Sequence, residues 1–320
     1  MITEKQIVDF CANKEISHLQ KGDFENLATS ELRPQEIHAR INKEGVHIIR
    51  QHDSQEVARI RTFMNLISSC GVDFSDVDFE TIIYFGDDLT FYDDGAPRLC
   101  FTRRKNDRNI LIPDPHIFNV TQLVSHFGDW DCDFKNKKDE AVFAGSYCGG
   151  SKPEENQRFK FCWDNQDNKL GNFKITNFFM NVVPNGHIKY LEEYDWNKIY
   201  ADFLAPCDQM KYKYIFNING ETNCWDRLLW AMYSNSVCIY LTPKRNDMSW
   251  YYHYFKTFGA FLKVDEIDWE PTVKWLNQNP SIAEKISKRQ TKFAVPLVKT
   301  KTHYSYLKEI ITRYNSIYNS

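Results

Sequence analysis

The segment KYKYIFNING, residues 211–220, combines an apolar strand pattern with a glycine turn, and Arg227 follows it on the next predicted helix. In doubly wound sheets, ligands bind at the carboxyl ends of strands, where the backbone N–H groups of a following helix can meet a phosphate. An arginine near that point would add a planar pair of donors for a diphosphate. The same spacing also describes a plain strand, turn and helix with a surface arginine, so the pattern alone leaves both interpretations open.

A second segment, AVFAGSYCGG at residues 141–150, is a predicted strand that runs into a loop of small residues, with Arg158 downstream. Gly145 and the two later glycines allow a ligand to approach the backbone closely, and Ser146 supplies a hydroxyl group. These features predict a cradle for a phosphate or a sugar. Taken by itself, however, a single glycine-rich loop is weak evidence and favours a surface loop.

These segments need strands and helices that bring them to one edge of a sheet. Strands and helices alternate along most of the chain, which is typical of βαβ units in a parallel sheet covered by helices. The predicted strands are 46–50, 80–85, 141–143, 212–218, 237–241 and 259–264, and the segments 98–102 and 110–113 are interpreted as further strands or loop edges. The predicted helices are 3–11, 34–41, 55–69, 225–233, 268–277, one that begins at Pro280, and 304–318.

A chain of 320 residues predicts two domains of about 150 residues each, and the polar run 129–140 is the candidate boundary. The 40 basic and 43 acidic residues nearly cancel, so no overall field favours nucleic acid or an anionic membrane. The nine cysteines are odd in number and contain no C-x-x-C pair, which favours reduced thiols over a disulfide framework or structural zinc. With no secretory signal or apolar span in the sequence, we expect a cytoplasmic protein.

Together, these segments resemble glycosyltransferase family 90, which includes protein O-glucosyl- and O-xylosyltransferases, capsule-associated proteins and lipopolysaccharide-modifying enzymes. The block FAGSYCGG at 143–150, with Arg158, is similar to the family pattern F-R-G-S-x-x-G-G…R. The block at 211–220, followed by Arg227 and by residues 235–237, is similar to K-Y-K-Y-L…G…R…G-S-L/V. A weaker block lies within residues 258–294. Ala144 and Asn235 depart from the family pattern.

The resemblance implies residue roles on both sides of a reaction site. A nucleotide-sugar site would be lined by Gly145, Ser146, Arg158, Gly220, Arg227 and Ser236. The catalytic aspartate would be Asp87, after the apolar run 81–85, with the adjacent Asp88 as the alternative. Arg103 occupies the position of a basic residue beside the site.

The resemblance also implies an α/β fold of GT-B type, with two Rossmann-like domains facing a central cleft. Residues 1–135 would form the acceptor-side domain that carries Asp87, residues 136–300 the donor domain, and residues 301–320 a helix packing back on the first domain. The expected reaction is an inverting transfer of glucose or xylose from a UDP-sugar to a hydroxyl group of a glycan, without a metal or another cofactor. The expected partners are a nucleotide sugar and a glycan acceptor, without nucleic acid and with at most peripheral membrane association.

Two alternatives stay open. Asp129 and Asp131 form a D-x-D pattern, which in a metal-dependent glycosyltransferase would hold a divalent ion on the diphosphate, although a solvated linker is the favoured interpretation. From another class, the chain could bind a nucleotide sugar or a glycan without catalysis. The aromatic run WYYHY at 250–254 predicts either core packing or stacking on a base or a sugar.

Overall fold

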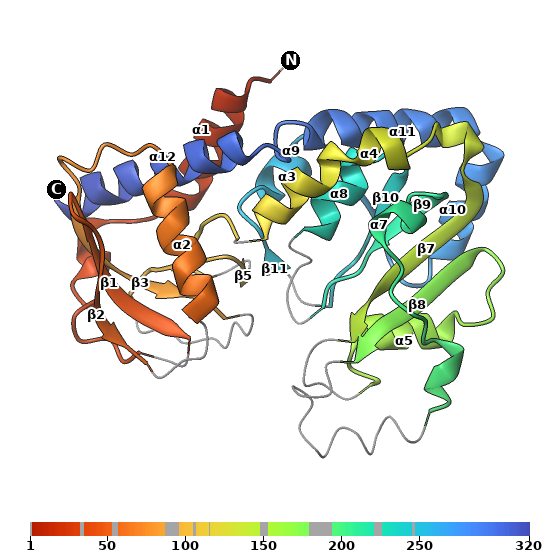
Figure 1. Cartoon of the computed structure of the whole chain (residues 1–320), viewed down its shortest axis with the longest axis horizontal. Coiled ribbons are helices and arrows are strands. Elements are labelled where there is room, and N and C mark those ends of the chain that lie inside the picture. Colours follow the sequence, from red (N-terminus) through yellow and green to blue (C-terminus); the bar gives the residue numbers. More distant parts are fainter. Residues whose placement is uncertain are drawn as a thin grey trace. The chain divides into compact units, whose positions relative to one another are not determined.

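The chain folds into two compact units. The computed structural model describes residues 2–32, 35–52, 57–86, 96–104, 107–114, 116–147, 153–178, 194–220, 226–244 and 247–320. Unit 1 comprises residues 1–118, 246–258 and 299–320, and unit 2 comprises residues 119–245 and 259–298. Both contain sheets and helices, so the α/β class is confirmed (Figure 1).

Unit 1 is built on a mixed five-stranded sheet with strand order β2-β1-β3-β4-β6. The strand β1 is antiparallel to both β2 and β3, whereas β3, β4 and β6 run parallel. Their bounds are β1 Glu36–Asn42, β2 Gly45–Gln51, β3 Asp78–Tyr84, β4 Arg98–Cys100 and β6 Ile110–Leu111. A separate ladder joins β5, Arg103–Arg104, to β11, Asp247–Met248. The expectation of a wholly parallel sheet is therefore wrong for this unit.

One predicted helix of unit 1, residues 34–41, is wrong because β1 occupies most of that segment. Ile37 and Ile41 are both buried and lie four residues apart. A spacing of four fits one face of a helix and also one face of a strand, whose side chains alternate with a period of two. Ala39 between them is buried on the same face of the strand, and Glu36 and His38 on the other face are buried as well, so both faces of β1 are largely covered. Gly45, with φ of 117°, closes the hairpin to β2 in a conformation that favours glycine.

The first and the last helix of the chain both belong to unit 1. They are α1 Glu4–Ile16, α2 Val57–Ser69, α9 Tyr252–Thr257 and α12 Thr300–Tyr318, together with the 3-10 turn η1 Lys21–Phe24. Thr3 and Gln6 form a capping box that fixes the start of α1. Trp250 stacks on Tyr306 of α12 with ring centroids 4.0 Å apart, and Tyr251 and Tyr254 are also buried. The described aromatic side chains of 250–254 therefore belong mainly to the core of this unit.

Unit 2 is a doubly wound α/β fold. Its five strands are all parallel, in the order β12-β10-β9-β7-β8. Their bounds are β7 Lys138–Tyr147, β8 Gly171–Phe178, β9 Tyr212–Asn217, β10 Val237–Leu241 and β12 Leu262–Val264. Its helices are α3 Ile117–Ser125, α4 Phe127–Trp130, α5 Gln157–Asp164, α7 Pro206–Gln209, α8 Arg227–Tyr233, α10 Trp269–Gln278 and α11 Pro280–Ala294, with the 3-10 turns η2 Phe134–Asn136 and η3 Trp196–Lys198. The predicted βαβ unit, β9-α8-β10, is confirmed.

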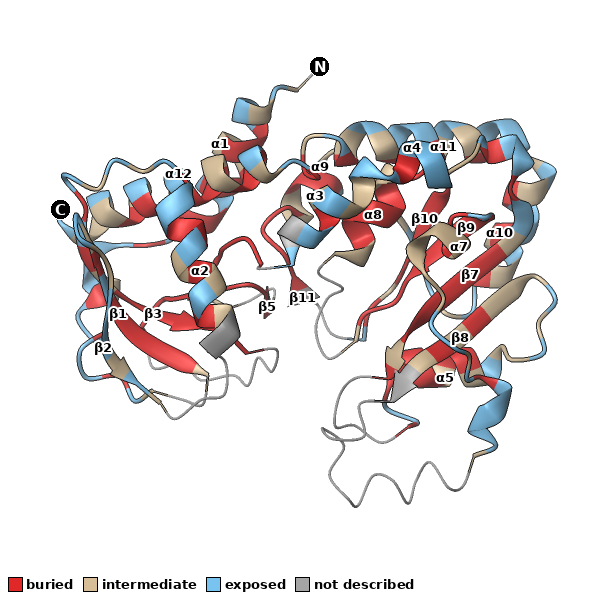
Figure 2. Ribbon diagram, in the orientation of Figure 1, coloured by how far each residue is buried: buried red, intermediate tan, exposed pale blue. Residues whose placement is uncertain are grey.

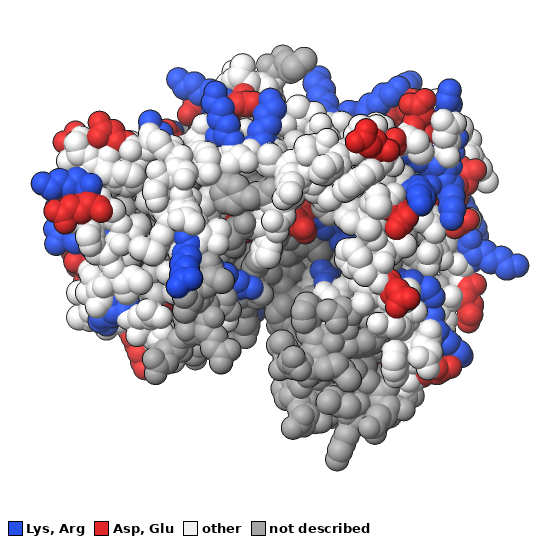
Figure 3. Space-filling view, viewed as in Figure 1, with Lys and Arg blue, Asp and Glu red and all other residues white. Residues whose placement is uncertain are grey.

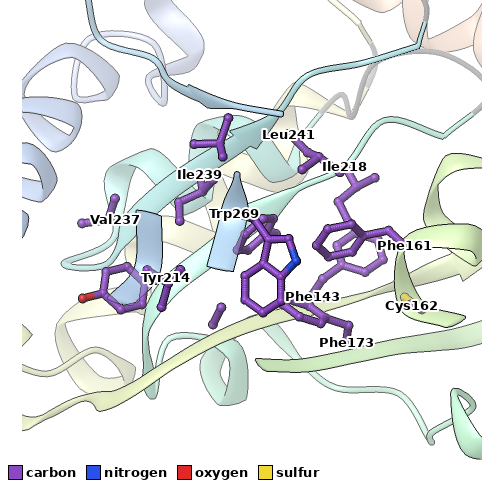
Figure 4. Packing of buried hydrophobic residues seen from close by; sticks show 14 of the residues in the cluster. Phe143, Phe161, Cys162, Phe173, Tyr214, Ile218, Val237, Ile239, Leu241 and Trp269 are labelled. Atoms are coloured by element: carbon purple, nitrogen blue, oxygen red, sulfur yellow. The ribbon is translucent and has the colours of Figure 1, made fainter. Parts of the chain in front are cut away.

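The core of unit 2 lies between this sheet and the helices α5 and α10. Phe143, Phe216 and Trp269 meet there with the other apolar side chains drawn in Figure 4. The rings of Phe216 and Trp269 are 5.9 Å apart in an edge-to-face arrangement. Replacing one such buried ring by alanine typically costs about 3–5 kcal/mol. Figure 2 shows that the strands β7, β9 and β10 are mostly buried, whereas α11 has an exposed outer face.

The surface agrees with the balanced composition. Basic and acidic side chains are interspersed over the face shown in Figure 3 rather than gathered in one field. Among the described residues, none of the helices is both long and apolar enough to cross a lipid bilayer. The cysteines that the structure describes are all free thiols, as the sequence predicted.

Candidate functional site

The order of the strands in unit 2 points to one place for a ligand. From β7 the chain moves outward to β8 on one side, and it then returns to β9 on the other side. The boundary between β7 and β9 is the topological switch point, and ligands of such sheets bind at the carboxyl ends of the strands there. The pairing recorded between β7 and β9 ends at Val142 and Ile215, so the strands part toward that edge.

Arg158, the second residue of α5, spans the place where β7 and β9 part. Its Nε donates to the carbonyl oxygen of Ile218 at 3.0 Å, and its Nη1 donates to the carbonyl oxygen of Ser146 at 3.0 Å. The side chain is nearly buried. Asn156 positions the helix, because its side-chain oxygen accepts a hydrogen bond from the N–H of Phe159 and so caps α5. Arg158 thus joins the ends of the two strands through its guanidinium group.

Arg227, the first residue of α8, approaches the same end of β7. Its Nη2 donates to the carbonyl oxygen of Ala144, and its Nη1 donates to Oε1 of Gln209 at 2.8 Å. The guanidinium carbons of Arg227 and Arg158 lie 5.0 and 5.8 Å from the ring centroid of Phe143. Two cations therefore gather around one buried aromatic ring, an arrangement that concentrates positive charge at this end of β7.

Gly145 is the residue that leaves room for this packing. A β-carbon at this position would lie 2.8 Å from Cζ of Phe143 and 3.4 Å from Nη2 of Arg227. The first separation is shorter than van der Waals contact, and the buried ring has little room to move. The β7–β8 register also shifts between Gly145 and Ser146. The sequence singled out Gly145 for close approach of a ligand, and the structure shows close approach of the protein's own side chains.

Two asparagines at the end of β9 are part of this edge, although sequence analysis gave them no role. Asn217 is completely buried and Asn219 is 5% exposed. Within the described part of the chain, neither amide atom of Asn217 has a hydrogen-bond partner, and the same holds for Oδ1 of Asn219. A buried polar group without a partner typically costs on the order of 1–3 kcal/mol. The signal was available in the sequence, because two asparagines alternate with apolar residues at the end of a buried strand.

The structure brings together four of the residues expected to bind the donor: Gly145, Ser146, Arg158 and Arg227. Gly220 follows Asn219 just beyond the end of β9 and is partly buried. Ser236 lies elsewhere, before the first residue of β10, and its hydroxyl donates to the carbonyl oxygen of Tyr212 at 2.7 Å. Tyr212 begins β9, so Ser236 lies at the amino ends of the parallel strands, roughly 15 Å along them from the carboxyl edge.

Arg103 belongs to unit 1, where two of its three guanidinium nitrogens contact other residues and, among the described residues, the buried Nε has no hydrogen-bond partner. Its Nη2 lies 3.2 Å from Oε1 of Glu15, and its Nη1 donates to the carbonyl oxygen of Asp107 at 2.7 Å. Burial raises the pKa of Glu15 to about 7, against the opposing effect of the Arg103 charge. In the described structure, Arg103 therefore forms an ion pair with the buried carboxyl group of Glu15.

The expected catalytic residue, Asp87, and its neighbour Asp88 lie outside the described residues. The chain before them is described up to Gly86, which follows the central strand β3 of unit 1. A β-carbon on Gly86 would overlap the ends of the Gln35 and Tyr84 side chains, so a larger residue here would force both side chains to move. The nearby carbonyl oxygen of Phe85 accepts a hydrogen bond from Nη1 of Arg59 at 2.6 Å.

Asp131, half of the D-x-D pattern, holds together a polar network within unit 2. Its Oδ1 accepts hydrogen bonds from Nζ of Lys137 and from the N–H of Cys132, and its Oδ2 accepts one from the N–H of Asn235 at 2.7 Å. Lys137 is buried, and its ammonium group also donates to the carbonyl oxygen of Met210 at 2.6 Å. These contacts give Asp131 a structural role at the turn before β10.

Comparison with known families agrees with the blocks quoted from the sequence. Residues 101–320 match the model of a family described as Glycosyl transferase family 90. The match includes the whole of unit 2 with its paired arginines, and it begins after the segment that contains Asp87. No curated protein matches the chain. The match covers well over half of the sequence, and the chain therefore belongs to glycosyl transferase family 90 and is a glycosyltransferase.

Proposed function

We propose that the protein is an inverting, metal-independent glycosyltransferase that moves a sugar from a UDP-sugar to a hydroxyl group of a glycan. UDP-glucose and UDP-xylose are the proposed donors. The observation that carries this proposal is the pair Arg158 and Arg227, both within 6 Å of the Phe143 ring centroid at the switch point of a doubly wound sheet. A GT-B-type arrangement is part of the proposal, with the donor site in unit 2 and the catalytic aspartate in unit 1.

The proposed reaction uses one carboxylate and two guanidinium groups. The acceptor oxygen attacks the anomeric carbon as the carboxylate of Asp87 takes its proton. The bond between that carbon and the diphosphate oxygen breaks, and the nucleoside diphosphate leaves with the electron pair. Arg158 and Arg227 stabilise the charge that develops on the leaving group, where fixed cations are already in place before the reaction. Ser146 and Gly220 complete the proposed donor site.

The Asp131 network supports a mechanism without a metal at the D-x-D pattern. A carboxylate that already accepts hydrogen bonds from an ammonium group and two backbone N–H groups has little remaining capacity for a cation. The proposed charge neutralisation therefore rests on the two arginines.

Replacing the proposed base tests this function. We expect Asp87→Asn to lower the rate of transfer by at least about a hundredfold while leaving the Kd of the donor within a fewfold of the wild type. Transfer would be measured as UDP release in the presence of acceptor, and donor binding by calorimetry, with Asp88→Asn as the matched control. A fully active Asp87→Asn enzyme would remove Asp87 from the mechanism, and loss of transfer only in Asp88→Asn would assign the base to Asp88.

A further inference from the structure

The asparagines Asn217 and Asn219 offer unused hydrogen-bonding groups at the carboxyl end of β9. Asn217 is the last residue of the strand, and Asn219 lies two residues further on. Within the described part of the chain, Oδ1 and Nδ2 of Asn217 and Oδ1 of Asn219 are buried without partners. Buried amide groups in folded proteins nearly always have partners, so these three atoms indicate a place where a bound molecule completes the structure.

The two side chains share a neighbour on the next strand. Asn217 pairs with Tyr240 in the parallel register of β9 and β10. Nδ2 of Asn219 donates to the hydroxyl oxygen of Tyr240 at 3.3 Å. Side chains alternate along a strand, so Asn217 lies on the opposite face of the sheet from Phe216 and the aromatic core. The crossovers β7-α5-β8 and β9-α8-β10 run in opposite directions across the sheet. Because such crossovers are right-handed, α5 and α8 cover opposite faces of the sheet, and α8 covers the face on which Asn217 lies.

The two asparagines are also close in the chain to the proposed diphosphate site. Ile218, between them, has its carbonyl oxygen bonded to Nε of Arg158. On the facing strand, the carbonyl oxygen of Ala144 is bonded to Nη2 of Arg227. Ala144 and Asn217 each lie two residues beyond Val142 and Ile215, the last recorded pair of β7 and β9. A donor whose diphosphate meets the two arginines would therefore extend along the asparagines.

The chemistry of the unpaired atoms selects the part of the donor that they would bind. Two carboxamide oxygens accept hydrogen bonds and need O–H or N–H donors, which an ionised diphosphate lacks. The Nδ2 group of Asn217 donates, so the matching group also accepts. A neutral vicinal diol meets both needs, and a nucleotide sugar carries one on its ribose and further hydroxyl groups on its sugar.

We propose that Asn217 and Asn219 bind a vicinal diol of the nucleotide-sugar donor. This diol belongs to an uncharged part of the donor, adjacent to the diphosphate at the arginine pair, and its recognition contributes to donor specificity. This inference rests on the proposed function, because it requires a nucleotide-sugar donor. It adds two specificity-determining residues and a ligand chemistry to that site.

The test compares Asn217→Leu with the control Asn277→Leu. Leucine keeps the approximate shape of asparagine and removes the amide. Asn277 lies in α10 of the same unit, and both its amide atoms are bonded, to the Tyr214 hydroxyl and to the carbonyl oxygen of Asp139. We expect Asn217→Leu to have an unchanged or raised Tm without ligand, and Asn277→Leu to have a lowered one.

Binding is measured by calorimetry with UDP, UDP-glucose and inorganic pyrophosphate. For Asn217→Leu we expect the Kd for UDP-glucose to be at least about tenfold higher than that of the wild type, because two hydrogen bonds to the diol are lost. The Kd for pyrophosphate, which has no diol, should be unchanged. An equal loss with UDP assigns the diol to the ribose, and a loss confined to UDP-glucose assigns it to the sugar. If Asn217→Leu fails to fold, Asn219→Leu provides the same comparison of ligand affinities, although it also removes the bond to the Tyr240 hydroxyl and so carries no expectation for Tm.

Two results would overturn the inference while leaving the proposed function intact. The first is an unchanged Kd for UDP and UDP-glucose in the asparagine variant. The second is an equal loss with all three ligands, pyrophosphate included, which would indicate a general disturbance of the site. A wild-type protein that binds neither UDP nor UDP-glucose would instead contradict the proposed function, and the inference with it.

Discussion

The Nη2 atom of Arg227 lies 3.4 Å from the position that a β-carbon on Gly145 would occupy. The same β-carbon would lie 2.8 Å from Cζ of Phe143, whose ring lies beside both arginines of the proposed donor site. Gly145 thus matters less for its own flexibility than for the space that it leaves to its neighbours. This relationship makes the glycine a sensitive probe of the site.

We expect Gly145→Ala to weaken donor binding by about ten- to a hundredfold, because the added methyl group must displace the Phe143 ring, which lies beside both guanidinium groups. The measurement is the Kd of UDP-glucose, with circular dichroism to establish that the variant folds. Gly128→Ala in α4 is the matched control, because a β-carbon there would meet nothing within 4 Å. Equal affinities in the two variants would contradict the proposed position of the donor site.

We expect Asp131→Asn to lower the free energy of unfolding by about 3–5 kcal/mol, because it leaves the buried ammonium group of Lys137 without its carboxylate. Urea unfolding measures the loss. The double variant Asp131→Asn, Lys137→Met should recover part of it, since the unpaired charge is then removed as well.

The same variant separates a structural role for Asp131 from metal binding. We expect EDTA to leave wild-type activity unchanged and Asp131→Asn to keep its activity at temperatures where it remains folded. An Asp131→Asn protein as stable as the wild type, with activity restored by added Mn²⁺, would instead support a metal-dependent enzyme.

Glu15 should make the stability of the protein depend on pH. Its folded-state pKa, about 7, lies above the ordinary value of 4.5, so the folded protein binds the proton more tightly than the unfolded chain does. The contribution of Glu15 to stability is therefore fully present below about pH 4.5 and is lost as the pH rises to about 7. We expect the Tm of the wild type, relative to that of Glu15→Gln, to fall as the pH rises from about 4.5 to about 7. At higher pH the difference between the two Tm values should stay constant. A difference that stays constant with pH would contradict the raised pKa.

Regular patterns in the sequence predicted unit 2 well and unit 1 less well. The strand β10 is a continuous apolar run, and every residue of β9 and β10 is buried, which is typical of a parallel sheet covered on both faces. In unit 1, β1 has the spacing of a helix as well as that of a strand, and its pairing with β3 joins residues about 40 apart in the sequence. Such pairing leaves no local signal in the chain.

The candidate site shows the same division between local and long-range information. Arg158 and Arg227 could be selected from motifs, because each follows a strand and a turn along the chain. That both lie beside Phe143 depends on the strand order, which the motifs do not contain. Ser236 belongs to the motif in sequence, but it precedes its strand, and the parallel sheet puts it at the opposite edge.

The most direct test of the account is nucleotide release from a panel of UDP- and GDP-sugars, measured with EDTA for the wild type, Arg227→Ala and the control Arg40→Ala. Arg40 forms an exposed ion pair with Asp78 in unit 1. We expect the wild type and Arg40→Ala to release UDP from UDP-glucose or UDP-xylose, and Arg227→Ala to release it more slowly by about a hundredfold or more. Release from no UDP-sugar, or equal rates in all three proteins, would contradict the proposed function.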